Sequence, residues 1–412
     1  MFISEPCTFS SEYGCWELAH IKTYSDENVY GERRDSEQTC FANLSAWRII
    51  ATANAATVSK LALRTCRHGV NLYIRRRKTM AKFGFGQMID RLKKDHKTIV
   101  FTEGTDARIL EASSRLLASN FLKPILIGNP EEIYDCAEDS GFNIRGANII
   151  SPYDFEDFDK MVDEFMEIRK GKVTSREDAE KLLRQNNYFG TMLVKMGYAD
   201  CLLGGATYST ADTVRPALQL IKTKPGNTIV SSCFILVRPG ATGENVVLAM
   251  GDCGININPN EDELVEIAEE TINCAKIFGV EPCVAFLSYS TNGSGTGPDV
   301  DKMRNAANKA KARNPLIPID GEMQFDAAVS PSVAKKKHPN SPVAGHANTF
   351  IFPDINAGNI GYKIAQRMGN FEAYGPILLG LNSPINDLSR GCTATEVYSM
   401  AIITAAFATK EQ

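Results

Sequence analysis

Several residue types that usually carry chemistry are scarce in this sequence. It has five histidines among 412 residues, and none of them stands in a nucleophile motif with serine or cysteine. Its eleven cysteines include no C-x-x-C pair, which disfavours a zinc site and a disulfide scaffold. This usage is typical of free thiols in a reducing cytoplasm, where we expect the protein to lie. No apolar run approaches the roughly 18 residues of a membrane span.

A strong net charge is missing as well. Lysine and arginine number 45 against 49 aspartates and glutamates, a formal net charge of -4. Such a chain has no global basic field, so nucleic acid and anionic membranes are not expected as partners. The common phosphate motifs are incomplete: after Gly293 and Gly295 the dinucleotide fingerprint meets Pro298, and Gly171-Lys172 lacks the upstream glycine of a P-loop.

Residues 1–79 differ from the rest of the chain. They hold four cysteines and both tryptophans and show little periodicity, and early acidic residues such as Glu5 argue against a secretory signal. From Met80 onward, apolar residues follow helix and strand spacing. We expect the native protein to start at Met80, with 1–79 as translated upstream sequence or a poorly ordered extension. A small accessory segment is the alternative.

The chain after Met80 alternates short apolar strands, such as 98–101 and 124–127, with helices. This order predicts mostly parallel sheets with helices on both faces. A second series of strands and helices begins near Thr228, and the apolar helix at 394–408 is expected to pack back on the first series. The prediction is an α/β protein with two α/β domains, one formed by 80–226 and 378–412 and the other by 227–377.

Three segments combine small polar residues with a basic residue. The first, residues 204–216, follows a strand and precedes a helix, so that its backbone amides can approach an anion. Asp212 and Arg215, three residues apart, can alternatively form a surface pair on that helix. The candidate anion ligands are the hydroxyls of Thr207, Ser209 and Thr210 and the guanidinium of Arg215.

The second segment, residues 356–363, again predicts a strand, a small-residue loop and a helix. The third, residues 386–392, comes directly before the last helix. Ser389 and Arg390 lie in the turn that leads into it, where amides and the helix dipole favour negative charge. Glu396 has two interpretations, a functional carboxylate or a helix cap, because Thr393-x-x-Glu396 is a capping box.

In this order, the three segments resemble the phosphate acetyltransferase family. The resemblance runs from about Met80 to the C-terminus, and residues 1–79 have no counterpart in it. It includes Tyr188-Phe-Gly-Thr-Met192, Gly251-Asp-Cys253, Asp320-Gly-Glu-Met-Gln-Phe-Asp326 and Gly361-Tyr-Lys-Ile-Ala-Gln-Arg367.

This resemblance implies a reversible transfer of acetyl between coenzyme A (CoA) and inorganic phosphate. It implies two α/β domains related to those of isocitrate and isopropylmalate dehydrogenases, with the active site in the cleft between them. Members are generally homodimers. They use acetyl-CoA, CoA, phosphate and acetyl phosphate as substrates and need no metal or other cofactor.

The family also implies roles for individual residues. Ser389 would hydrogen-bond the reacting thiol, Arg390 would stabilise negative charge on the acetyl carbonyl and phosphate, and Glu396 would be the carboxylate base. Arg169 and Arg215 match arginines that contact CoA or phosphate groups. The remaining candidate substrate contacts are Thr207, Ser209, Thr210, Asn359 and Gly391.

The sequence departs from the family pattern at two positions. Glu396 replaces the usual aspartate and is one methylene longer, and misplacing a catalytic group by about 1 Å can cost about 100-fold in rate. Tyr208 stands where many members carry histidine. Two other functions stay open, a phosphate butyryltransferase and a non-catalytic, acyl-CoA-binding regulatory domain.

Overall fold

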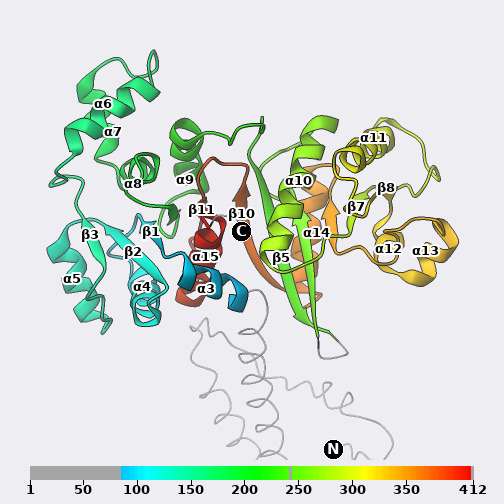
Figure 1. Cartoon of the computed structure of the whole chain (residues 1–412), viewed down its shortest axis with the longest axis horizontal. Helices are drawn as coiled ribbons and strands as arrows, with labels where there is room; N and C mark the ends of the chain where they lie inside the picture. The colour runs from blue at the N-terminus through cyan, green and yellow to red at the C-terminus, as the bar shows by residue number, and fades with distance from the viewer. Residues whose placement is uncertain (1–84, 241–243, 410–412) are drawn as a thin grey trace, which may run out of the picture. The chain divides into compact units, whose positions relative to one another are not determined.

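The computed structural model describes residues 85–240 and 244–409, which belong to one compact unit, Lys78–Gln412. The prediction for residues 1–79 therefore lies outside the described residues. Two β-sheets organise the unit, each accompanied by helices (Figure 1).

The first sheet has five parallel strands in the order β11-β4-β1-β2-β3. Apolar side chains on both faces of its central strands are buried, as expected for a parallel sheet between helices. The strands are β1 (Lys97–Phe101), β2 (Leu122–Ile127), β3 (Asn148–Ile150), β4 (Cys201–Gly204) and β11 (Ile385–Asp387).

Local sequence signals start several helices of this part. The Asp106 side chain accepts a hydrogen bond from the Arg108 amide at the start of α4, and Asn129 caps α5, whose first residue is Pro130. The helices are α3 (Phe85–Lys94), α4 (Ala107–Ser119), α5 (Pro130–Asp139), α6 (Phe158–Ile168), α7 (Arg176–Leu183), α8 (Asn186–Lys195), α9 (Thr210–Pro216), a π-helical turn (Ala217–Ile221) and α15 (Ala394–Phe407).

The second sheet is mixed, with six strands in the order β10-β5-β6-β9-β7-β8. Strand β5 pairs antiparallel with β10 and β6, and the other pairs are parallel. Its strands are β5 (Ser231–Pro239), β6 (Asn245–Gly251), β7 (Val284–Leu287), β8 (Ile319–Met323), β9 (Thr349–Ile351) and β10 (Glu372–Leu379). Its helices are α10 (Glu261–Ile277), α11 (Pro298–Arg313), α12 (Phe325–Val329), α13 (Pro331–Lys337) and α14 (Ile355–Arg367).

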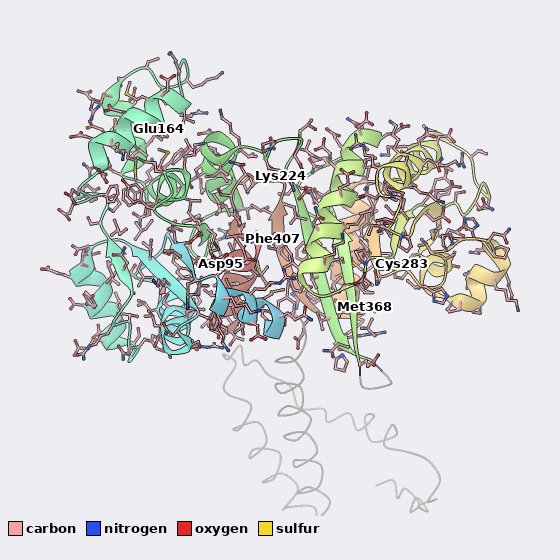
Figure 2. The ribbon with its side chains drawn as sticks, in the orientation of Figure 1. Asp95, Glu164, Lys224, Cys283, Met368 and Phe407 are labelled. Carbon is pink, nitrogen blue, oxygen red and sulfur yellow. The ribbon has the colours of Figure 1, made fainter. Side chains whose placement is uncertain are left out.

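The last helix, α15, is buried along most of its length because it is apolar on all sides. It contacts α4, α3 and strands of the first sheet, so the expectation that it packs back on the first series of elements is confirmed. Phe407, near its C-terminal end, packs against the same hydrophobic cluster as α3 and α4 (Figure 2).

These observations confirm the α/β class with mostly parallel strands. The strands of each sheet come from one of the two predicted stretches of chain. The exception is the end of β10 at Leu379, because the chain was predicted to return to the first domain at 378. The domain boundaries and the cleft between domains stay predictions.

Candidate functional site

Three loops meet at the carboxyl edge of the first sheet. Strands β11, β4 and β1 are neighbours and run parallel, so the segments that follow them emerge at the same edge. The Leu388 amide donates to the Gly204 carbonyl over 2.7 Å, which joins the loop after β11 to the loop after β4. The first and third sequence segments are therefore adjacent.

Ser389, Arg390 and Gly391 form an exposed turn directly before α15. The Cys392 amide donates to the Ser389 carbonyl over 2.9 Å, and the Gly391 amide donates to Ser389 Oγ over 3.3 Å. These bonds hold the Ser389 hydroxyl oxygen close to the turn that carries the Arg390 side chain.

Glu396 completes the capping box of α15. Its Oε2 accepts from the Thr393 amide over 2.7 Å and from Thr393 Oγ1 over 3.1 Å, while its own amide donates to Thr393 Oγ1 over 3.2 Å. The capping interpretation is confirmed as a structural role, with Oε2 as the capping atom. Within the part of the chain that the structure describes, Oε1 takes no such bond, so capping occupies only half of the carboxylate.

Arg108, on the first turn of α4, connects all three loops. Its Nη1 donates to the carbonyl of Arg390 over 2.8 Å and to that of Cys392 over 3.2 Å, and its Nη2 donates to the Ala206 carbonyl over 2.8 Å. The guanidinium also forms a bidentate ion pair with Asp106, in which Nε donates to Oδ1 over 2.9 Å and Nη2 donates to Oδ2 over 2.7 Å. Burial alone would raise the pKa of Asp106, but the bonds from Arg108 lower it below its usual value.

Glu103, just after β1, organises the loop after β4. Its buried carboxylate accepts from the amides of Gly205 at 2.9 Å and Thr207 at 3.2 Å through Oε1, and from Thr102 Oγ1 at 2.8 Å through Oε2. The hydroxyls of Thr102 and Tyr208 lie 2.6 Å apart. Thr102 donates its one hydroxyl hydrogen to Glu103, so the Tyr208 hydroxyl is the donor to Thr102. Burial raises the pKa of Tyr208.

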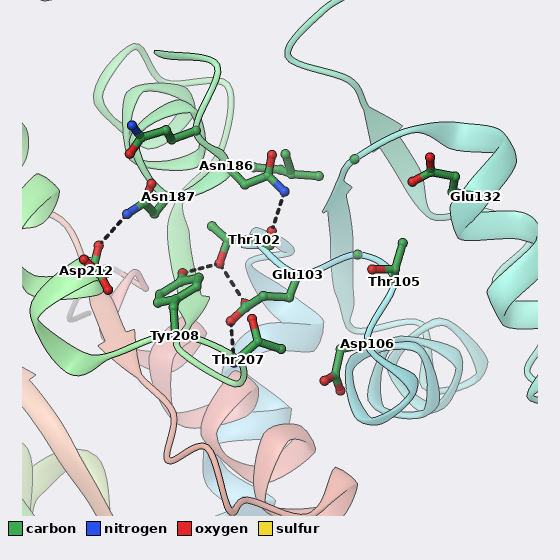
Figure 3. A pocket seen from close by; sticks show the side chains of 14 residues that line it. Thr102, Glu103, Thr105, Asp106, Glu132, Asn186, Asn187, Thr207, Tyr208 and Asp212 are labelled. Atoms are coloured by element: carbon green, nitrogen blue, oxygen red, sulfur yellow. Dashed lines mark hydrogen bonds between the residues drawn. The ribbon is translucent and has the colours of Figure 1, made fainter. Parts of the chain in front are cut away.

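A cavity of about 660 Å³ opens beside this chain of hydrogen bonds (Figure 3). It lies where β1, β2 and β4 end, the usual ligand position in a parallel sheet. Asn186 Nδ2 donates to the Thr102 carbonyl over 3.0 Å, and Asn187 Nδ2 donates to the Asp212 carbonyl over 2.8 Å. The charged lining residues among those the structure describes are all acidic: Glu103, Asp106, Glu132 and Asp212. Such walls disfavour a phosphate group.

The predicted substrate contacts are only partly gathered at this edge. Thr207 lines the cavity, and Gly391 lies in the turn before α15. The Ser209 hydroxyl donates to Asp212 over 2.7 Å, and Arg215 lies 3.9 Å from the same carboxylate, as in the surface-pair alternative. Thr210 Oγ1 donates to Asp387 over 2.6 Å, so its hydroxyl hydrogen is used in a bond within the protein.

Two other candidates lie elsewhere. Arg169 follows α6, and its buried Nε has no hydrogen-bond partner among the described residues. Asn359 lies inside α14 and donates from Nδ2 to the Cys253 carbonyl over 3.0 Å.

The prediction of a small-residue loop at 356–363 is wrong. Asp354 caps α14, and the helix runs through the whole segment. A Cβ on Gly358 would lie 2.6 Å from the Asp252 carbonyl oxygen. The small residue there permits a close approach of helix and backbone rather than an anion-binding loop.

Glu103, Arg108 and Asp387 belong to the site but were not among the candidate residues predicted from the sequence. A signal for them existed, because Glu103 lies just after the first strand, Arg108 lies at the start of the helix that follows, and Asp387 comes directly before Leu388-Ser389. The rule that the carboxyl ends of parallel strands share one edge would have placed these side chains together.

Among residues 85–240 and 244–409, no group of three histidine, cysteine, aspartate or glutamate side chains is arranged to hold a metal ion. Within the same ranges, no helix is both long enough and apolar enough to cross a membrane.

Comparison with known proteins assigns the family. The model of the phosphate acetyl/butaryl transferase family matches residues 85–405. This chain belongs to that family. Phosphate acetyltransferase of Bacillus subtilis is 54% identical over 313 residues, which cover 76% of this chain and 95% of that protein.

Two solved structures agree with this membership. A phosphotransacetylase from Streptococcus pyogenes is similar with a TM-score of 0.75 and 53% identity, over 79% of this chain and 98% of that one. The EutD phosphotransacetylase from Staphylococcus aureus gives a TM-score of 0.72 and 45% identity, over 79% of this chain and 99% of that one.

Proposed function

We propose that this chain is a phosphate acetyltransferase, which transfers acetyl reversibly between CoA and inorganic phosphate. The observation that carries the proposal is the 54% identity to phosphate acetyltransferase of Bacillus subtilis, which extends over 95% of that protein. The turn with Ser389 and Arg390 lies at the carboxyl edge of the first sheet, which supports a reaction centre there.

The reaction proceeds in a ternary complex. A phosphate oxygen attacks the acetyl carbonyl carbon, the C–S bond breaks, and its electron pair stays on the CoA sulfur, which then takes up a proton. Arg390 stabilises the negative charge that develops on the carbonyl oxygen, and Ser389 hydrogen-bonds the sulfur. No step requires a metal or prosthetic group, so prior dialysis against a chelator is expected to leave the rate unchanged.

Glu396 is proposed as the base that removes the CoA thiol proton in the reverse direction. Its Oε2 caps α15 and leaves Oε1 for the proton. The variant Glu396→Gln separates the two roles, because glutamine also completes a capping box. We expect unchanged thermal stability and a large loss of kcat. Full activity of this variant would remove Glu396 from the mechanism.

CoA and phosphate are proposed to occupy different parts of the site. The acidic cavity beside Glu103 suits an uncharged, polar portion of CoA, and the phosphate groups belong with arginines such as Arg390. Arg169, Thr207, Ser209, Thr210, Arg215, Asn359 and Gly391 stay proposed substrate contacts.

The test is the release of CoA thiol from acetyl-CoA with and without phosphate. Phosphate-dependent release supports the proposal, whereas CoA binding without cleavage would favour a regulatory domain. A higher kcat/KM for butyryl-CoA than for acetyl-CoA would overturn the acetyl assignment.

We further propose a homodimer in the cytoplasm. Three apolar side chains on the α14 side of the second sheet, Ile360, Ile364 and Met368, are 58%, 54% and 80% exposed and recur every four residues (Figure 2 labels Met368). A second copy would cover such a stripe. Light scattering of wild type and Ile364→Glu tests this: a dimer that persists in the variant would exclude this face. The described cysteines are all free thiols, which fits a reducing compartment, and cell fractionation tests it.

A further inference from the structure

We propose that Asp387 is a positioning residue that holds the Ser389–Arg390 turn against the loop after β4. The inference rests on the proposed function, because it concerns the same turn. Asp387 is the last residue of β11 and stands two residues before Ser389. Its side chain is 4% exposed, so it acts on the turn through neighbours rather than on a substrate.

The carboxylate of Asp387 connects β11 to α9. Its Oδ2 accepts from Thr210 Oγ1 and its Oδ1 from Thr213 Oγ1, each over 2.6 Å. The two threonines are three residues apart and therefore lie on the same face of α9. Both carboxylate oxygens are thus used to fix the strand end to one helix.

The loop after β4 closes around the same carboxylate. Gly205 has φ +97°, and a Cβ at this position would lie 2.2 Å from Asp387 Oδ1. Glycine is therefore required both by the left-handed backbone and by the contact. Together with the bond from the Leu388 amide to the Gly204 carbonyl, this contact sets the distance between the two loops.

The preceding residue anchors the opposite face of β11. Asn386, which is also buried, accepts from the Leu378 amide over 2.7 Å and donates to Thr404 Oγ1 of α15 over 2.8 Å. Successive strand residues point to opposite faces, so the chain is held from both sides just before Ser389. A change at Asp387 releases one of these sides and lets the turn shift.

A carboxylate is a costly choice for this position if stability alone is considered. Its hydrogen-bond partners among the described residues are two hydroxyls and no cation. Burial raises the pKa of Asp387, and the bonds from Thr210 and Thr213 offset this only in part. An amide would avoid the charge but could accept only one of the two hydroxyl bonds. The carboxylate of Asp387 therefore fixes the end of β11 at a cost in stability.

The experiment compares Asp387→Asn with wild type in phosphate-dependent cleavage of acetyl-CoA. We expect kcat to fall by about 100-fold, as for a shift of about 1 Å in a catalytic group, with a KM for acetyl-CoA near that of wild type. The melting temperature should stay equal or rise, because a buried charge is removed. Thr213→Val should lower kcat in the same way, and Thr213→Ser, which keeps the hydroxyl, should restore it.

Asp200→Asn is the matched control. Asp200 precedes β4 at the amino edge of the same sheet, accepts from the Thr98 amide over 2.7 Å, and should leave kcat unchanged. Because Asp387 and Thr213 act as one unit, the double variant Asp387→Asn/Thr213→Val should be no slower than the slower single variant.

A folded Asp387→Asn protein with wild-type kcat would overturn the inference. So would a loss of kcat that only follows a loss of thermal stability, or an equal loss in Asp200→Asn. If Asp387→Asn does not fold, the comparison of Thr213→Val with Thr213→Ser decides. An inactive wild type would instead overturn the proposed function and this inference with it.

Discussion

Two buried carboxylates of the candidate site, Glu103 and Asp387, differ in their partners from Glu322 of the second sheet. In the second sheet, Glu322 of β8 pairs with Arg304 of α11, with Nε at 2.8 Å from Oε2 and Nη2 at 3.1 Å from Oε1. In the first sheet, Glu103 and Asp387 are bonded by backbone amides and hydroxyls, with no cation among their described hydrogen-bond partners.

The pKa values respond in opposite directions. Burial alone would raise the pKa of Glu322, but the bonds from Arg304 and the Gly293 amide lower it below the usual value. Burial raises the pKa of Glu103 and of Asp387, and their hydrogen bonds do not overcome it. Glu103 and Asp387 therefore lack a cationic partner where the loops of the candidate site meet, as expected where function rather than stability selects a residue.

The largest effect on stability is expected for Arg304→Ala. Removing the cation leaves the buried Glu322 carboxylate without its ion-pair partner, which should lower the free energy of unfolding more than the loss of an exposed ion pair does. Urea denaturation measures this change. Arg313→Ala, which removes an exposed ion pair with Glu269 at 3.5 Å, should change stability by about 0.5 kcal/mol or less. Equal effects of the two variants would contradict the comparison.

The next largest effect on stability is the expected difference between Glu103→Ala and Glu103→Gln. Glu103→Ala leaves the amides of Gly205 and Thr207 without their acceptor and should destabilise by about 2 kcal/mol. Glu103→Gln keeps an oxygen for both amides and removes the buried charge, so its stability at neutral pH should equal or exceed that of wild type. Paired melting curves test this, and a glutamine variant as unstable as the alanine variant would show that the charge itself is needed for folding.

A smaller effect is expected in the pH dependence of stability, and the raised pKa of Glu103 determines its direction. Because the pKa of Glu103 is raised in the folded state, that state holds the proton more tightly than the unfolded one. Relative to Glu103→Gln, wild type should therefore lose stability as pH rises from about 4.3 through the raised pKa, and the difference should then stay constant.

At the second sheet, the comparison of wild type with Glu322→Gln should show the opposite pH dependence of stability. The folded-state pKa of Glu322 is lowered. Relative to Glu322→Gln, wild type should gain stability as pH rises from that lowered pKa to about 4.3. Urea denaturation midpoints over a pH series measure the stability difference between wild type and each glutamine variant. If both differences changed in the same direction with pH, the contrast between Glu103 and Glu322 would be refuted.

A smaller loss of stability than for Glu103→Ala is expected for Tyr208→Phe. The substitution removes the donor to Thr102 but leaves the bond from Thr102 to Glu103, so a loss of about 1 kcal/mol is expected. Tyr374→Phe in the second sheet removes a longer bond, 3.3 Å to Glu372, and should cost less. Thermal melts compare the two, and a larger loss for Tyr374→Phe would contradict the ranking.

Much of the fold could be predicted from the sequence. The apolar run at 98–101 is buried between helices and forms β1, and the strand at 201–203 and the final helix are found within a few residues of their expected bounds. The capping box at Thr393 and Glu396 was also predictable, because its residues lie three apart and the interaction is local.

The arrangement of the site was less predictable, for two physical reasons. The bonds that organise it join distant residues, such as Asp387 and Thr213 at 174 positions apart, and depend on the place of β11 in the sheet. Strand β11 has only three residues, too few for a periodic signal. At 356–363, helix and loop could not be distinguished, because the glycine that permits close packing also permits a turn.

The most direct test of the central claim is the kcat of Arg390→Ala for phosphate-dependent release of CoA from acetyl-CoA, with Arg313→Ala as the control. If Arg390 stabilises the developing negative charge, its loss should lower kcat by about 100-fold or more at unchanged thermal stability, while the control keeps wild-type activity. An Arg390→Ala enzyme with full activity would contradict the reaction centre proposed at Ser389 and Arg390.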